Sequence, residues 1–159
     1  MYYHVSIGGN IQPDKNIGCA VVKLTQLFGE LTLFPRVSTD AVEMIEVNEF
    51  INTAAIFESS LSPTAVKAIL NDIEVELGRD RDDPLCSVKN RCCDIDIFQV
   101  LDSPQPDSFL SSDESYVKAV FTSNRHAAIQ CEQLYLGDGS TTINLQTGPS
   151  NELVINQVF

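Results

Sequence analysis

The chain has 159 residues, 43% of them hydrophobic, so it is long enough to bury the core of one domain without metals or disulfides. Ten Lys and Arg against 22 Asp and Glu give a net charge of −12, and the field of such a chain repels phosphate. This balance excludes a general binder of nucleic acid or of anionic membranes, so an anionic ligand has to be captured locally.

The first predicted elements are a strand and a helix. The N-terminal stretch YYHVSIGG alternates, with Tyr3, Val5 and Ile7 on one face, and its two glycines predict a turn. From Pro13 onward the pattern predicts an amphipathic helix that ends at Gly29. Its apolar stripe consists of Ile17, Ala20, Val21, Leu24, Leu27 and Phe28.

The next elements complete a regular order. ELTLFPRVS and FINTAAIFES predict two strands, separated by an acidic loop from 39 to 49. Ser62 and Pro63 start a second helix, which Gly78 ends, and RCCDIDIFQV at 91 to 100 predicts a further strand. Strand, helix, strand, strand, helix, strand is the ferredoxin-like pattern. It predicts an α+β fold with an antiparallel sheet and both helices on one face.

The last third of the chain is predicted to extend this core. Positions 101 to 115 are rich in Ser, Asp and Pro and predict an exposed loop. A short helix from 116 to 133, a turn at GDGS and one or two closing strands from TTINLQTG and NELVINQVF follow. We expect one domain over residues 1–159, with a core at 1–100 and a divergent C-terminal part.

The cysteines and the hydropathy predict the compartment. The five cysteines are odd in number and form no C-x-x-C pair, and neither a signal peptide nor an apolar run of about 18 residues is present. We therefore expect a cytoplasmic protein with reduced thiols. We also expect a monomer or weak dimer. Zinc is not expected, because the two histidines, His4 and His126, lie far apart.

Two aspartates stand in the apolar strand RCCDIDIFQV. Alternation places Asp94 and Asp96 on one face and Cys93, Ile95 and Ile97 on the other. Two carboxylates on one face repel unless a cation lies between them, so the pair predicts a divalent metal, and oxygen ligands favour magnesium carrying a polyphosphate. The alternative is a solvent-facing strand edge, because D-x-D is a short motif.

Four of the ten basic residues directly precede these aspartates: Arg79, Arg81, Lys89 and Arg91. One interpretation is a solvated loop whose charges pair with Asp80, Asp82 and Asp83. The other is phosphoryl or pyrophosphoryl transfer, in which cationic side chains stabilise the transition state. Arg79 and Arg91 would then act from the two ends of a loop that closes over a nucleotide.

Four stretches together resemble one family. They are Gly8-Gly9-Asn10, FINTA at 50 to 54, Glu74 followed by LGRDR at 77 to 81, and NRCCDIDIF at 90 to 98. In this order and at this spacing they resemble 6-hydroxymethyl-7,8-dihydropterin pyrophosphokinase of folate biosynthesis, which has a ferredoxin-like core. The resemblance implies transfer of pyrophosphate from ATP to the hydroxymethyl group of the reduced pterin, with these two small molecules as partners.

The resemblance also implies roles for individual residues. Two Mg²⁺ ions would bind Asp94 and Asp96, with Arg79 and Arg91 as catalytic, phosphate-binding arginines. The residues implied for the nucleotide are Asn71, Glu74, Arg81, Lys89, Tyr116 and Lys118.

Three residues are implied for the pterin. Asn52 would hydrogen-bond the ring, Phe50 would stack on it, and Phe121 would cover its other side. The alternatives are ordinary core positions for the two phenylalanines and a satisfied strand-end amide for Asn52.

Several features of the family are missing from the chain. The loop TDAVEMIEV lacks the family's T-x-P-x-G, and SSDESYVKAVF lacks its P-H and Arg-x-Phe features. Three hypotheses follow: an active but divergent pyrophosphokinase, a weakened or repurposed paralogue that binds a pterin or related heterocycle without efficient transfer, and a structural module. The first is favoured because the aspartates, the arginines and Asn52 are retained.

Overall fold

The computed structural model describes residues 1–34, 36–39, 50–86, 89–122, 143–147 and 153–157. Its elements, in chain order, are β1 (Tyr2–Gly9), α1 (Pro13–Phe28), β2 (Leu31–Leu33), β3 (Val37–Thr39), β4 (Phe50–Glu58), α2 (Pro63–Glu76), β5 (Asp94–Leu101), the 3-10 helix η1 (Pro106–Ser111), α3 (Ser115–Thr122), β6 (Ile143–Thr147) and β7 (Leu153–Gln157).

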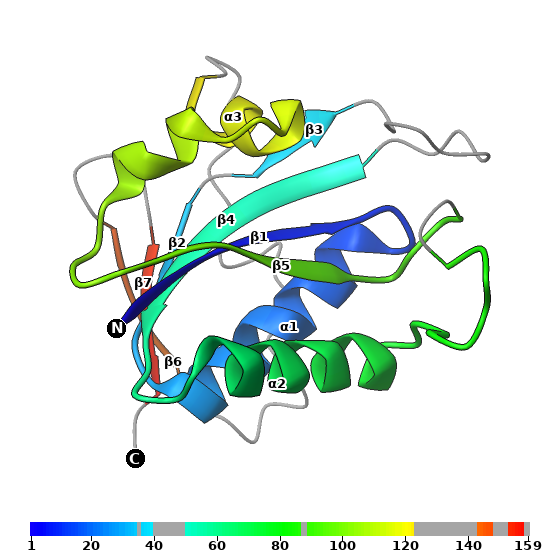
Figure 1. Cartoon of the computed structure of the whole chain (residues 1–159), viewed down its shortest axis with the longest axis horizontal. Coiled ribbons are helices and arrows are strands. Elements are labelled where there is room, and N and C mark those ends of the chain that lie inside the picture. The colour runs from blue at the N-terminus through cyan, green and yellow to red at the C-terminus, as the bar shows by residue number, and fades with distance from the viewer. Residues whose placement is uncertain (35, 40–49, 87–88, 123–142, 148–152, 158–159) are drawn as a thin grey trace.

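The strands form one antiparallel sheet in the order β5-β1-β4-β2-β7-β6, with β3 on β4. Helices α1 and α2 lie together on one face (Figure 1). This arrangement confirms the predicted α+β, ferredoxin-like fold. The predicted second strand is in fact two short strands, β2 and β3. The sequence places Pro35 between them, and proline has no N–H to continue the hydrogen-bond ladder.

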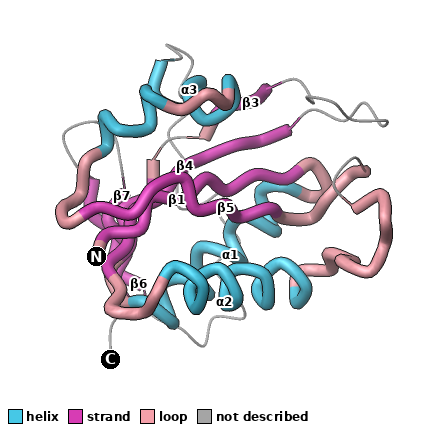
Figure 2. Tube along the Cα trace, viewed as in Figure 1, coloured by secondary structure: helices cyan, strands magenta, loops and turns pink. Residues whose placement is uncertain are grey.

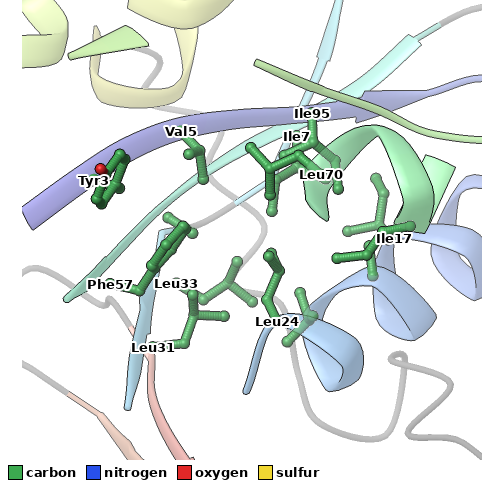
Figure 3. Packing of buried hydrophobic residues seen from close by; sticks show 14 of the residues in the cluster. Tyr3, Val5, Ile7, Ile17, Leu24, Leu31, Leu33, Phe57, Leu70 and Ile95 are labelled. Atoms are coloured by element: carbon green, nitrogen blue, oxygen red, sulfur yellow. The ribbon is translucent and has the colours of Figure 1, made fainter. Parts of the chain in front are cut away.

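The main core lies between the sheet and these two helices. Tyr3, Val5 and Ile7 of β1 are fully buried there, as the alternation predicted, and pack with Leu24 of α1 and Leu70 of α2 (Figure 3).

The start of α2 and the end of α1 match the prediction. The Ser62 side chain accepts a hydrogen bond from the Ala65 N–H at the start of α2, and Gly29 follows α1 with a φ of 83°. The predicted stripe of α1 was too wide, because Leu27 is 57% exposed.

The opposite face of the sheet carries a second core that the sequence did not predict. The stretch predicted as an exposed loop contains η1, whose Phe109 is fully buried and stacks on Phe98 with ring centroids 5.4 Å apart. Helix α3 completes this layer (Figure 2). The abundance of Ser, Asp and Pro favoured an exposed loop, but the buried ring of Phe109 packs this stretch against the sheet. The prediction of an exposed loop was therefore wrong at this position.

The C-terminal strands extend the same sheet. β7 pairs with β2 and β6 pairs with β7, which confirms two closing strands. Helix α3 confirms the start of the helix predicted from 116, and the remainder of that helix, the GDGS turn and positions 40–49 of the acidic loop lie outside the described residues.

No helix in the described part of the chain is both long and apolar enough to span a membrane. The four cysteines described, Cys19, Cys86, Cys92 and Cys93, are free thiols.

A buried histidine fastens the chain after β5 to β1. His4 is fully buried, and its Nε2 accepts a hydrogen bond of 3.0 Å from the Gln105 N–H, while Nδ1 lies 3.3 Å from the Tyr2 carbonyl. An N–H can only donate, so Nε2 is the acceptor and the proton of the neutral ring is on Nδ1. Burial lowers the pKa of His4 below its ordinary value.

This arrangement predicts an acid-sensitive stability. Because the pKa of His4 is lower in the folded than in the unfolded chain, stability is full above the unfolded value of about 6.5 and is lost as the pH falls below it. The free energy of unfolding should fall between about pH 7 and pH 5, by at most about 1.4 kcal/mol per pH unit for one proton. Urea unfolding of wild type and of His4→Gln would measure this. An equal pH dependence in both proteins would contradict the prediction.

Candidate active site

Most of the predicted site residues lie where four element ends meet. The end of β1, the start of β4, the end of α2 and the start of β5 lie at the same end of the sheet (Figure 1). Strand register fixes the meeting point, because Gly8 of β1 is paired with Asn52 of β4 on one side and with Asp94 of β5 on the other. Residues distant in the sequence are therefore neighbours here.

Asp94 lies between two arginines. Its Oδ1 accepts a hydrogen bond from Arg79 Nη1 and its Oδ2 accepts one from Arg91 Nη1. The arginine side chains are only 9% and 15% exposed, and Asp94 is 21% exposed. Although burial opposes it, the charges of Arg91 and Arg79 lower the pKa of Asp94 below its ordinary value. Asp94 is therefore a charged carboxylate with both oxygens directed at cations.

Glu74 connects α2 to β5 from beneath this cluster. Its side chain is fully buried, with Oε1 accepting a 2.8 Å hydrogen bond from the Ile95 N–H and Oε2 accepting bonds from Arg79 and Arg81. Burial raises the pKa of Glu74, and the Ile95 hydrogen bond and the Arg79 charge oppose that rise. Arg81 also donates a 2.8 Å hydrogen bond to Asn71 Oδ1. One hydrogen-bonded network thus joins the helix, the loop and the strand.

The interpretation of the basic stretch as a loop that pairs with its own acids was wrong for three of its four cations. Arg79, Arg81 and Arg91 pair with the buried Glu74 and with Asp94. Only Lys89 follows that interpretation, with its Nζ 2.7 Å from Asp83 Oδ2.

Asp96 lies on the same strand face but in a different environment. Its side chain is 53% exposed, and its Oδ1 lies 2.7 Å from Nζ of Lys67, which also donates a 2.8 Å hydrogen bond to the Ile95 carbonyl. Sequence reasoning missed Lys67. A signal was present, since positions 67, 71 and 74 follow the i, i+4, i+7 spacing that places residues on one face of a helix.

The turn after β1 holds the backbone that carries Arg91. Asn10 is 8% exposed, its Oδ1 accepts a 2.8 Å hydrogen bond from the Arg91 N–H, and its Nδ2 donates a 2.5 Å bond to Asn90. A Cβ on Gly9 would lie 2.5 Å from the Cys92 carbonyl oxygen, so only glycine allows this close approach of two backbones. The Gly-Gly-Asn stretch therefore positions the loop end next to Asp94.

The residues predicted for the pterin lie on β4, at the same end of the sheet. Phe50 is 9% exposed, and the Arg91 guanidinium lies over its ring, 5.6 Å from the centroid. Asn52 is 6% exposed and its Nδ2 donates a 2.7 Å hydrogen bond to Thr39 Oγ1. Phe50 therefore contacts the arginine cluster directly. Asn52 is separated from Asp94 by Gly8 of β1, which pairs with both residues.

Helix α3 carries two further residues predicted for the nucleotide, Tyr116 and Lys118. Burial, together with the charges of Glu114, Asp96 and Asp94, raises the pKa of Tyr116 to about 12, so its phenol is a neutral hydrogen-bond donor. Lys118 is two positions further along α3 and does not share that face of the helix.

Phe121 packs in the second core. Its ring stacks on Phe109 at 4.7 Å and lies 5.0 Å from the ring of Phe34. The pterin role of Phe121 and the nucleotide roles of Tyr116 and Lys118 stay predictions.

The donor set suits a hard divalent cation and an anionic ligand. Asp94 and Asp96 present carboxylate oxygens from one strand face, which is the ligand type that Mg²⁺ prefers. Arg79 Nε is a buried donor without a hydrogen-bond partner among the described residues. Such a donor beside a cluster of cations is suited to bind an oxygen of a phosphate group.

Comparison with known families agrees with this geometry. The model of the 7,8-dihydro-6-hydroxymethylpterin-pyrophosphokinase (HPPK) family matches residues 4–120, which include every residue described above for the site except Phe121. A search of curated proteins found no match to the chain. Members of this family act in folate biosynthesis as pyrophosphokinases and use ATP and Mg²⁺. Because the match covers well over half of its residues, the chain belongs to the HPPK family.

Proposed function

We propose that the protein transfers the pyrophosphoryl group of ATP to the hydroxymethyl group of 6-hydroxymethyl-7,8-dihydropterin. The observation that carries the proposal is Asp94, a charged carboxylate placed between two largely buried arginines. A pyrophosphoryl transfer site needs a carboxylate for the metal and fixed cations for the phosphate oxygens within one small volume. This arrangement supplies both.

Each group has a separate task in this proposal. Asp94 and Asp96 would hold two Mg²⁺ ions, which when bound neutralise phosphate charge and orient the polyphosphate. Arg79 and Arg91 would bind the phosphate oxygens, and Nε of Arg79, which has no hydrogen-bond partner within the described part of the chain, is a further donor for them. Phe50 and Asn52 would stack on and hydrogen-bond the pterin beside these groups. A cytoplasmic location and a monomer or weak dimer stay predictions.

The test is formation of AMP from ATP with 6-hydroxymethyl-7,8-dihydropterin and Mg²⁺ present. Pterin-dependent AMP release that stops when Mg²⁺ is chelated is the expected result. Folded, magnesium-replete protein that releases no AMP would overturn the proposal. In that case calorimetric titration separates the remaining hypotheses, because pterin binding without turnover supports a repurposed paralogue and no binding of pterin or nucleotide supports a structural module.

A further inference from the structure

Lys67 forms an ion pair with Asp96, one of the two carboxylates that the proposed function assigns to the metal. Its Nζ lies 2.7 Å from Asp96 Oδ1 and 2.8 Å from the Ile95 carbonyl oxygen. Asp94 likewise forms ion pairs, with Arg79 and Arg91. The two pairs differ in burial, because the Lys67 and Asp96 side chains are 36% and 53% exposed, whereas the arginines are largely buried. The contact at Asp96 is therefore the one that opens most readily.

A pocket lies beside this contact and offers Lys67 another position. It has a volume of about 630 Å³ and is lined by Pro63, Thr64, Lys67, Ala68, Asn71, Asp96 and Ile97. Its size lies within the range of small-molecule sites, which is about 300–1,000 Å³. Lys67 and Asn71 are four residues apart on α2, so both face the pocket from one side of the helix. The four-carbon stem lets the ammonium group turn from Asp96 into this space.

We propose that Lys67 is a positioning residue that couples the divalent cation to the nucleotide. It holds Asp96 while this carboxylate has no metal, and it contributes its charge to the phosphate or ribose oxygens of the nucleotide when a divalent cation engages Asp96. This inference rests on the proposed function. It follows from simple competition, since one carboxylate oxygen cannot keep a close ammonium contact and a divalent cation without repulsion between the two.

The competition predicts effects of opposite sign on two ligands. Lys67→Met keeps most of the stem and removes the charge. It should tighten binding of Mn²⁺, measured alone by electron paramagnetic resonance, about threefold, because an exposed ion pair no longer has to be broken. It should weaken binding of α,β-methylene-ATP with Mg²⁺, measured by calorimetry, about tenfold, because a charge-assisted contact is lost. Lys67→Arg should restore nucleotide binding in part.

The control removes one positive charge from a lysine outside the proposed site. Lys23 of α1 pairs with Glu76 of α2, and its side chain is 34% exposed, so Lys23→Met matches the substitution in chemistry and exposure. Both dissociation constants should stay at the wild-type values in this control. A change equal to that of Lys67→Met would mean a general effect of net charge and would overturn the inference.

The remaining outcomes separate the inference from the function on which it rests. If wild type binds Mn²⁺ and the nucleotide analogue and Lys67→Met binds both equally well, the role of Lys67 is wrong and the proposed function stands. If wild type binds neither ligand, the proposed function fails and the inference fails with it.

Discussion

Replacing Asp94 by asparagine is expected to lower the rate of pyrophosphoryl transfer by on the order of 10³-fold, comparable to the loss of a central electrostatic group in other enzymes. Asparagine keeps the shape but removes the charge that would hold Mg²⁺. Its amide also presents donor hydrogens to one of the two arginines that Asp94 now accepts from. The measurement is AMP release at saturating ATP and pterin, with Mn²⁺ binding as a second readout that does not depend on turnover.

The matched control for this substitution is Asp102→Asn. Asp102 is an exposed aspartate directly after β5, so its neutralisation changes the net charge equally without touching the arginine cluster. Its rate and its Mn²⁺ affinity should equal those of wild type. A folded Asp94→Asn protein that retains normal Mn²⁺ binding and turnover would show that Asp94 is a structural partner of the arginines and not a metal ligand.

Local patterns predicted most of the fold. Residue periodicity and the residues at the helix ends suffice for β1, α1, α2 and β5, because each has a clear apolar face and a clear stop. The second core could not be predicted in this way. Phe109 is buried by Phe98 and Phe121, which come from elements before and after it, and the surrounding Ser, Asp and Pro residues show no period. Such burial depends on tertiary packing that no local window contains.

The site shows the same division between local and long-range information. Alternation places Asp94 and Asp96 on one face, and the structure confirms this, with Cys93 and Ile95 in the core. The partners of these aspartates are set by how α2 lies against β5. Local charge counting therefore left the arginines undecided between the neighbouring acids of the loop and a phosphate site, and it missed the contact of Lys67 with Asp96. The family resemblance, which carries long-range information, favoured Arg79 and Arg91 as a phosphate-binding pair.

Glu74→Gln is expected to lower the free energy of unfolding by about 3 kcal/mol, because it removes one partner from a buried ion-pair network. Glutamine can still accept the hydrogen bond of the Ile95 N–H, but its amide cannot satisfy Arg79 and Arg81 with one charged oxygen. Arg79 is only 9% exposed, so its charge stays desolvated with Asp94 as its remaining carboxylate partner among the described residues. Urea unfolding at neutral pH would measure the loss.

The matched control lies two positions further along the same helix. Glu76 is 60% exposed and pairs with Lys23, and Glu76→Gln should cost less than about 1 kcal/mol, as expected for an exposed ion pair. Equal costs for the two substitutions would contradict the assignment of Glu74 as the buried anchor of Arg79.

The predicted difference between Glu74→Gln and Glu76→Gln also applies to the rate of transfer. If Glu74 fixes Arg79, then Glu74→Gln should slow transfer even at temperatures where the variant is fully folded, whereas Glu76→Gln should leave the rate unchanged.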